Sequence, residues 1–293
     1  MAPSAPIFEL ARVQYAVPAP LISMAVSSDM LAMGLSGNQV QIVLIELSRP
    51  EQVVKLPIQR KPSEFSLHKL FLDPSGRHLI VTSTQGENWY LYKGWKKFKQ
   101  LKSFKMVIES IAWNKAALLS SANSTSSREF LIGARNGTIY EALLDAEDDF
   151  FKSQERYVNP VFSFPERMAI TGIQYQVLPP ADLRQAVVIL TTASRIYQFS
   201  GPLDKKADEG SRIFTSLFSR YKDTAPRKFL CTLSIVTNYI LFDQVYWNCR
   251  ETLTSPNFTS SHPMRTRPNP YQSQWHGRMV RISAHILSST TCS

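Results

Sequence analysis

Long hydrophobic runs and cysteine are both scarce in this sequence. No apolar stretch approaches the ~20 residues that a membrane-spanning helix needs, and the nearest, Leu230–Phe242, is interrupted by polar residues. Three cysteines in 293 residues are too few for a disulfide framework, which favours a reducing compartment. The N-terminus carries no charged region ahead of an apolar core, so no secretory signal is predicted.

Motifs of common catalytic and nucleotide-binding sites are also missing. There is no Gly-x-Ser-x-Gly nucleophile elbow and no glycine-rich phosphate loop ahead of a helix. Positive charge is in excess, because 33 Lys and Arg residues are set against 23 Asp and Glu residues, which gives a net charge of +10. This balance favours contact with polyanions or an acidic membrane without choosing between them.

What is present is a repeated strand pattern, which is clearest in Phe65–Lys93. Three short apolar runs are separated there by the turn sequences Asp73–Gly76 and Gln85–Asn88. Proline at the second position of the first turn fixes φ, glycine at the fourth tolerates the exit, and the Asp73 carboxylate is predicted to cap backbone N–H groups. The runs are too short for ordinary helices and rich in β-branched and aromatic residues, which predicts a meander of three strands.

Three further copies of this pattern occur in the chain, and they decide the predicted fold. The copies begin near Leu21, His68, Glu109 and Thr171, at intervals of 47, 41 and 62 residues. Intervals of ~40–50 residues are typical of β-propeller blades, the last copy having a long insertion. The predicted fold class is therefore all-β, a partial β-propeller of about four to five blades with a poorly structured C-terminal tail.

The end of the chain differs from the rest. We expect a lead-in over residues 1–18, propeller blades over residues 19–230 and an atypical tail over residues 231–293. The tail has no lysine, and its middle is rich in Pro, Ser and Thr. Either it is a regulatory tail or it is a foreign reading frame, and the stop of the repeat in mid-blade favours the second. The spacings of its cysteines and histidines do not predict a zinc site, and no metal or other cofactor is predicted. These residues are Cys231, Cys249, Cys292, His262, His276 and His285.

The densest basic segment is Lys93–Lys105, in which aromatic residues are interleaved with lysines. One interpretation is a contact for lipid headgroups or for nucleic-acid phosphates. The other, which we favour, is an exposed outer hairpin whose lysines protect an edge strand from pairing. The candidate residues for contact with an acidic membrane or an acidic partner are Lys96, Lys97, Lys99, Lys102 and Lys105.

Two other segments predict helices. The acidic run Asp145–Asp149 predicts either a partner-facing helix or, preferably, a solvated linker with acids at a helix N-terminus. Asp204–Tyr221 ends in apolar residues with helical spacing, which predicts a short amphipathic helix that packs on the core. His68 and His78 lie on strands of one repeat; an acid–base pair is conceivable there, but two separate structural histidines are the commoner arrangement.

Several consecutive motifs resemble the N-terminal domain of the vacuolar protein sorting-associated protein 18 (deep orange) family. The resemblance covers roughly Ala19–Leu230, and the agreement of the motifs in order makes it specific. The motifs are Lys61–Glu64, His68–Gly76, Gly86–Asn88, Ile108–Asn114, Ile132–Glu141 and Ser194–Phe199.

The resemblance implies a β-propeller at the head of a long subunit that is shared by the HOPS and CORVET tethering complexes. Such a subunit would bind other class C vacuolar sorting subunits, and indirectly Rab GTPases and SNAREs, peripherally on late endosome and vacuole or lysosome membranes. In the family an α-solenoid and a RING-type zinc domain follow, and this chain departs from the pattern after Leu230. We therefore expect an incomplete ring with bare apolar sheet surface that is unstable or inactive as a tether alone.

The leading function is thus a non-catalytic scaffold that offers surface to partner proteins. An alternative is a propeller-based enzyme, which would need acids or histidines converging on inner strands, where residues such as Ile111–Trp113 are mostly apolar. Another alternative is a nucleic-acid-binding propeller, suggested by charge alone; no nucleic-acid partner is expected.

Overall fold

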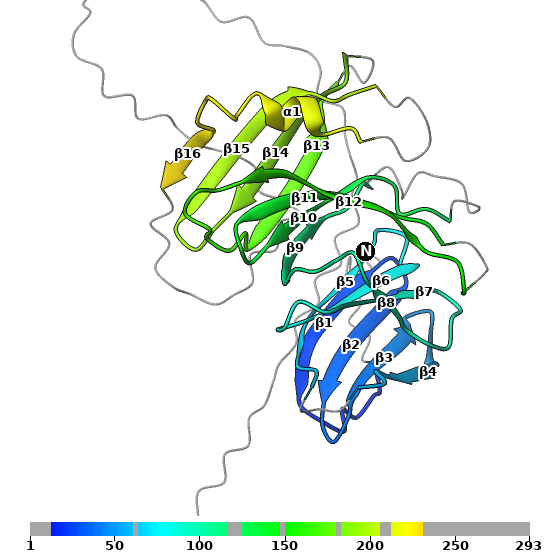
Figure 1. The fold of residues 1–293 in the computed structure, drawn as a ribbon. Helices are drawn as coiled ribbons and strands as arrows, with labels where there is room; N and C mark the ends of the chain where they lie inside the picture. Colours follow the sequence, from blue (N-terminus) through cyan, green and yellow to red (C-terminus); the bar gives the residue numbers. More distant parts are fainter. Residues whose placement is uncertain are drawn as a thin grey trace, which may run out of the picture. The chain divides into compact units, whose positions relative to one another are not determined.

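The computed structural model describes residues 13–60, 64–115, 125–146, 150–179, 183–205 and 212–230. The predictions for the tail, including its cysteines and histidines, lie outside these residues. The described part of the chain forms four antiparallel sheets of four strands each, which follow one another along the sequence (Figure 1). In each sheet the strands are paired in sequence order, so each sheet is a simple meander. This confirms the predicted all-β propeller class.

The first two sheets have these strands: β1 (Leu21–Ser27), β2 (Met30–Ser36), β3 (Val40–Glu46), β4 (Arg49–Pro57), β5 (Leu67–Leu72), β6 (His78–Ser83), β7 (Asn88–Tyr92) and β8 (Lys99–Leu101). The third and fourth sheets have these: β9 (Ile108–Ala112), β10 (Phe130–Ala134), β11 (Thr138–Leu144), β12 (Glu155–Ser163), β13 (Gly172–Val177), β14 (Gln185–Thr191), β15 (Arg195–Pro202) and β16 (Arg227–Leu230). The sequence predicted three strands in each repeat. The structure has a fourth, which lies at the outer edge of every sheet.

Neighbouring sheets are held together by apolar side chains on their facing surfaces. β6, β9 and β10 are buried along their whole length, because a sheet lies against each of their two faces. Three clusters fill the spaces between successive sheets, centred on Ile42 and Leu70, on Ile80 and Ile132, and on Leu131 and Val188. Burial of this apolar surface is the main stabilising term for the stack.

Backbone turns fix the ends of the strands as the sequence predicted. The Asp73 carboxylate accepts hydrogen bonds from the backbone N–H groups of Ser75, Arg77 and His78 at 3.2, 2.8 and 2.9 Å. Gly76 has a φ of 68°, and its N–H donates to the Asp73 carbonyl oxygen at 2.9 Å. The Asp73–Gly76 turn is therefore closed by one side chain, and the predicted capping role of Asp73 is confirmed.

The acidic run Asp145–Asp149 lies partly outside the described residues, which omit 147–149. In the described part, Asp145 pairs with Ser126 in an isolated β-bridge, Phe150 and Phe151 lie in a turn and not in a helix, and Glu155–Ser163 is the outer strand β12. A helix was expected because the acidic run could favour a helix N-terminus. The free backbone N–H and C=O groups along the edge of β11 favour a strand more strongly, and β12 pairs with them along Thr138–Leu144.

The short helix predicted near the end of the fourth repeat is α1 (Thr215–Ser219). Leu217 and Phe218 are buried, together with Phe214 just before the helix, in the cluster that covers the fourth sheet. The side chain of Phe218 packs against Phe199 of β15, with ring centroids 5.2 Å apart and ring planes inclined at 59°. The predicted core-packing role of this apolar stripe is confirmed.

A buried carboxylate positions the segment that leads into α1. Glu141 of β11 accepts hydrogen bonds from the N–H groups of Ile213 and Phe214 at 2.7 and 3.2 Å and from the Tyr157 hydroxyl at 3.2 Å. Burial raises the pKa of Glu141 and the negative charge of Glu129 adds to the rise, although the hydrogen bonds act against it. The ionised form therefore destabilises the folded state relative to the protonated form.

The pH dependence of stability should report this carboxylate. A raised folded pKa contributes stability below the unfolded value near 4.5, and this contribution is lost as pH rises. The unfolding free energy of the wild type, relative to that of Glu141→Gln, should therefore increase as the pH is lowered from 7 to 5. Urea unfolding at the two pH values measures this, and a difference that stays constant or shrinks would contradict it.

The face of β1 that points away from the second sheet is exposed. Met24 and Val26 are 46% and 41% exposed, whereas Leu70 of β5 and Ile173 of β13, which face a preceding sheet, are 5% and 3% exposed. No sheet precedes the first in the described part of the chain. The first sheet therefore carries an apolar stripe of the kind that packs against a neighbour elsewhere in the stack.

Candidate interaction surfaces

The two ends of the sheets carry different connections. In a four-strand meander the turn between the second and third strands lies at the same end as the connection to the next sheet. We call this end the turn face: it has the β2–β3, β6–β7, β10–β11 and β14–β15 turns and the connections that enter β5, β9 and β13. The other turns of each sheet lie at the opposite end.

The five candidate lysines are not brought together by the fold. Lys96 and Lys97 lie in the β7–β8 connection at the opposite end, whereas Lys102 and Lys105 lie in the connection to β9, on the turn face. Lys99 lies between them on β8, the outer strand of its sheet. The five residues are contiguous in sequence, but β8 separates two pairs of them. Their contact with an acidic membrane or partner stays a prediction.

Lys99 contacts the β11–β12 connection of the neighbouring sheet. Its Nζ donates to the backbone carbonyl oxygens of Phe150, at 2.8 Å, and of Lys152, and lies 5.6 Å from the centroid of the Phe150 ring. The Phe150 ring stacks edge-on against Trp95, with centroids 5.0 Å apart. Phe151 beside it is 91% exposed. This contact has no signal in the sequence, because the two segments are about fifty residues apart and belong to different repeats.

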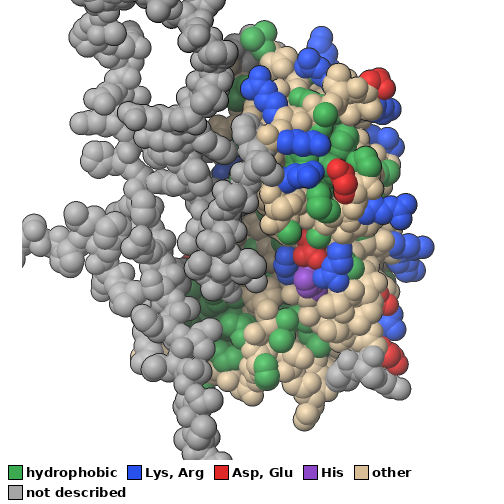
Figure 2. Space-filling view, turned by 90° about the vertical axis from the view of Figure 1, so that its left-hand side faces the viewer, with side chains coloured by type: hydrophobic (Ala, Val, Ile, Leu, Met, Phe, Trp, Pro, Cys, Tyr) green, Lys and Arg blue, Asp and Glu red, His purple; other side chains and the backbone are tan. Residues whose placement is uncertain are grey.

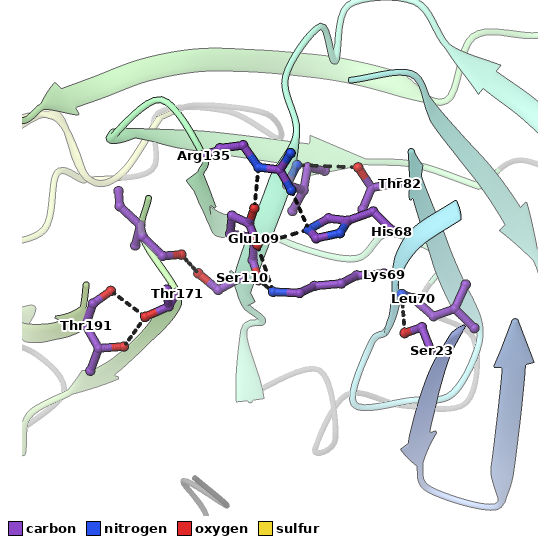
Figure 3. A network of polar contacts seen from close by, with 12 residues as sticks. Ser23, His68, Lys69, Leu70, Thr82, Glu109, Ser110, Arg135, Thr171 and Thr191 are labelled. Carbon is purple, nitrogen blue, oxygen red and sulfur yellow. Dashed lines mark hydrogen bonds and ion pairs between the residues drawn. The ribbon is translucent and has the colours of Figure 1, made fainter. Parts of the chain in front are cut away.

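A polar network joins the inner strands of the second and third sheets (Figure 3). Its centre is Glu109 on β9, whose side chain is 9% exposed. The carboxylate accepts hydrogen bonds from Lys69 Nζ at 2.8 Å and from Arg135 Nε at 2.7 Å, and it lies 3.0 Å from His68 Nε2. His68 and Lys69 come from β5 and Arg135 from the β10–β11 turn, so the network bridges two sheets. We call these four residues the Glu109 network.

The charges of this network determine its protonation. Burial acts to raise the pKa of Glu109, but the hydrogen bonds from Lys69, Arg135 and His68 outweigh it and lower the pKa to about 2. Glu109 is therefore ionised at neutral pH, and its oxygens are occupied by cationic donors. Such a carboxylate holds two sheets in register and is unsuited to act as a general acid near pH 7.

Further polar contacts continue along the inner strands. The Leu70 N–H donates to the Ser23 hydroxyl at 3.0 Å, which connects the first and second sheets, and the Ser110 hydroxyl donates to the Ile170 carbonyl oxygen at 2.7 Å, which connects the third and fourth (Figure 3). Each pair of successive sheets thus has at least one hydrogen bond beside its apolar contacts. These bonds fix how one sheet is placed on the next.

The two histidines of the second sheet do not form an acid–base pair. His78 is buried, and its Nδ1 lies 2.8 Å from the Tyr90 hydroxyl; burial lowers the pKa of His78 to about 4. His68 contacts Glu109 and Arg135 instead. Both histidines therefore serve the packing of the sheets, which is the arrangement that sequence analysis favoured.

The turn face has a surplus of basic side chains. Figure 2 shows a histidine side chain that adjoins acidic and basic ones, with further Lys and Arg side chains on the same face. Of the two described histidines only His68 reaches the surface, since His78 is 1% exposed. No helix in the described part of the chain is long and apolar enough to cross a membrane.

Comparison with known proteins gives one family. Residues 6–249 match the Pep3/Vps18/deep orange beta-propeller domain, a match that begins before and ends after the region Ala19–Leu230 in which the motifs were recognised. The chain is 29% identical over 224 residues to the vacuolar protein sorting-associated protein 18 homolog of Danio rerio, covering 75% of this chain and 22% of that protein. It is 26% identical over 204 residues to the vacuolar membrane protein pep3 of Schizosaccharomyces pombe, covering 69% and 21%.

The chain therefore spans about a fifth of the length of these relatives. Among solved structures it is similar to the β-propeller domain of Cps50 (Swd1) from Myceliophteria thermophila, with a TM-score of 0.44 and 13% sequence identity. That similarity covers 65% of this chain and 60% of the other.

Proposed function

Since this chain belongs to the Pep3/Vps18/deep orange β-propeller family, we propose that it is the β-propeller of a non-catalytic scaffold subunit in vacuolar protein sorting. It offers surface to other class C subunits of HOPS- and CORVET-type tethering complexes, and through them to Rab GTPases and SNAREs. The subunit works peripherally on late endosome and vacuole or lysosome membranes, where it brings vesicles together before fusion. The observation that carries the proposal is the family match over residues 6–249.

The chemistry of the described residues supports a scaffold over an enzyme. The buried carboxylates of Asp73, Glu109 and Glu141 each accept hydrogen bonds from groups that close a turn, join two sheets or position a helix. Buried polar groups that are satisfied in this way stabilise a fold. A surface-presenting role requires no more of them.

Domain replacement tests the function in the setting of a complete subunit. The corresponding region of the fission yeast protein pep3 would be replaced by this chain, and delivery of a vacuolar hydrolase reporter would be measured in cells that lack the native protein. We expect rescue of sorting and co-purification of the other class C subunits. A chimera that accumulates to the wild-type level but restores neither would overturn the proposal.

Peripheral membrane contact is tested on the two separated lysine pairs. Each lysine near an anionic surface contributes about 1 kcal/mol, so Lys96→Glu with Lys97→Glu should weaken flotation with phosphatidylserine vesicles by more than tenfold. Lys102→Glu with Lys105→Glu makes the same charge change at the turn face and tests separately whether the second pair contacts the membrane. Unchanged flotation of the first variant would contradict the predicted membrane contact of Lys96 and Lys97.

A further inference from the structure

Two connections on the turn face each carry an exposed cation that the fold does not use. Lys105 precedes Met106, whose carbonyl carbon lies 3.4 Å from where a Cβ on Gly86 would be, and Arg167 lies directly against Gly137. Both charged side chains are exposed, and neither makes a hydrogen bond or ion pair with any residue that the structure describes. Asn88 Nδ2 donates to the carbonyl oxygens of Phe104 and Met106, on either side of Lys105, and the Gly137 turn packs directly on the backbone of Arg167, so both cations stand on fixed backbone.

The backbone of Arg167 is in an unfavourable conformation. Its φ is 50°, in the left-handed region that residues other than glycine, asparagine, aspartate and histidine seldom adopt. Glycine or asparagine would have this conformation at lower energy, and the guanidinium makes no hydrogen bond or ion pair with the described residues in return. A charged side chain at such a position is a reason to look for a function at the surface.

The Glu109 network adds two oriented cations to the same face. Lys69 and Arg135 are 36% and 46% exposed, and Glu109 fixes the position of both. The Lys69 ammonium donates to Glu109 Oε2 and to the Glu109 carbonyl oxygen at 2.9 Å, which leaves one of its three N–H groups for another acceptor. Two permanent cations share one carboxylate, so the network has an excess of positive charge.

We propose that the turn face of the second to fourth sheets docks an acidic segment of a partner protein. Its carboxylates pair with four cations, which are Lys69, Lys105, Arg135 and Arg167. Charge complementarity of this kind selects the partner and speeds its encounter more than it adds affinity. The inference deepens the proposed function, on which it rests, by giving the chemistry of one partner.

A peptide fits this face better than a membrane or a nucleic acid does. Three acids lie on the same face: Glu64 in the connection to β5, Glu87 in the β6–β7 turn and Glu166 in the connection to β13. A continuous anionic surface would meet these acids as well as the cations, whereas a peptide can place its carboxylates only at the cations. The exposed apolar side chains Phe151 and Leu183 lie at the opposite end, in the β11–β12 and β13–β14 connections.

Fluorescence anisotropy with the purified chain of 293 residues tests the docking surface. The probe is a fluorescein-labelled peptide of alternating Glu and Ser, titrated at physiological ionic strength. The test variant is Lys105→Ser with Arg167→Asn, because asparagine tolerates the left-handed backbone and preserves the fold. The matched control is Lys205→Ser with Lys222→Ser, which removes the same charge from two exposed lysines in the β15–β16 connection, at the opposite end. We expect the test variant to bind about fivefold more weakly and the control to bind as the wild type does.

Three results would overturn the proposal. Equal weakening in the test and control variants would mean that net charge alone attracts the peptide. Tighter binding of phosphatidylserine vesicles or of single-stranded oligothymidylate, with the same dependence on Lys105 and Arg167, would assign the face to a membrane or to nucleic acid. Absence of peptide binding by the wild type would also overturn it. Because the assay measures binding directly, each result leaves the outcome of the domain replacement in yeast unaffected.

Discussion

Gly137→Ala should lower the free energy of unfolding by about 2–4 kcal/mol, since two costs act at this one position. The φ of Gly137 is 78°, and a side chain in that conformation costs about 1 kcal/mol. A Cβ at Gly137 would also lie 2.8 Å from the Cα of Arg167, which is a contact with backbone. The connection into β13 would have to move, with an overpacking cost of about 1–3 kcal/mol.

Gly94→Ala is the matched control for this substitution. Gly94 has a φ of 93°, and no atom lies within 4 Å of the position of its Cβ. This variant therefore has the conformational cost alone and should lose about 1 kcal/mol. Urea unfolding of the wild type and both variants gives the difference, which measures the close packing of the β10–β11 turn on the next connection. Equal losses in the two variants would contradict that packing.

The three inner strands of each sheet were predictable because their sequence signals are local. Apolar runs such as His78–Ser83 are buried on both faces, and turns such as Asn136–Gly137 require glycine where φ is positive. Strand and turn patterns of this kind depend on neighbours within a few residues. The repeat of the pattern then gave the architecture without any knowledge of long-range contacts.

The outer strands gave no such signal. In β4, eight of nine residues are exposed or half-buried, and only Leu56 is buried, so hydrophobic alternation is absent. β12 contains Pro160, which in a sequence argues against a strand, and β8 has three residues. These strands form because they complete the hydrogen bonding of β3, β11 and β7. Their pairing is decided by the sheet and not by their own residues.

The Glu109 network could be found in the sequence only through the repeat. His68 and Glu109 are 41 residues apart, so no motif spacing connects them. They are the first polar residues of successive repeats, however, and equivalent positions on neighbouring sheets lie side by side. The lysine segment shows the converse: Lys97 and Lys102 are close in sequence, but β8 places them toward opposite ends of a sheet.

The second large effect is expected at Glu109, because its removal leaves Lys69 and Arg135 without their shared counter-charge. Glu109→Gln keeps the shape of the side chain and should lower the unfolding free energy by about 1–3 kcal/mol at pH 7, the range for hydrogen bonds between charged groups when the partners are partly exposed. Glu166→Gln is the control, since Glu166 is 45% exposed and lies 3.9 Å from Arg195. An exposed pair of this kind contributes about 0–1 kcal/mol.

The pH dependence separates an electrostatic role of Glu109 from a steric one. The folded pKa of Glu109 is about 2 and the unfolded value is near 4.5, so its contribution is fully present above pH 4.5 and is lost as pH falls toward 2. The difference in unfolding free energy between wild type and Glu109→Gln should therefore shrink through this window. Equilibrium unfolding in urea at several pH values between 7 and 2.5 measures it. If the difference stayed constant, Glu109 would join the two sheets by shape alone and the charge of the network would be irrelevant to stability.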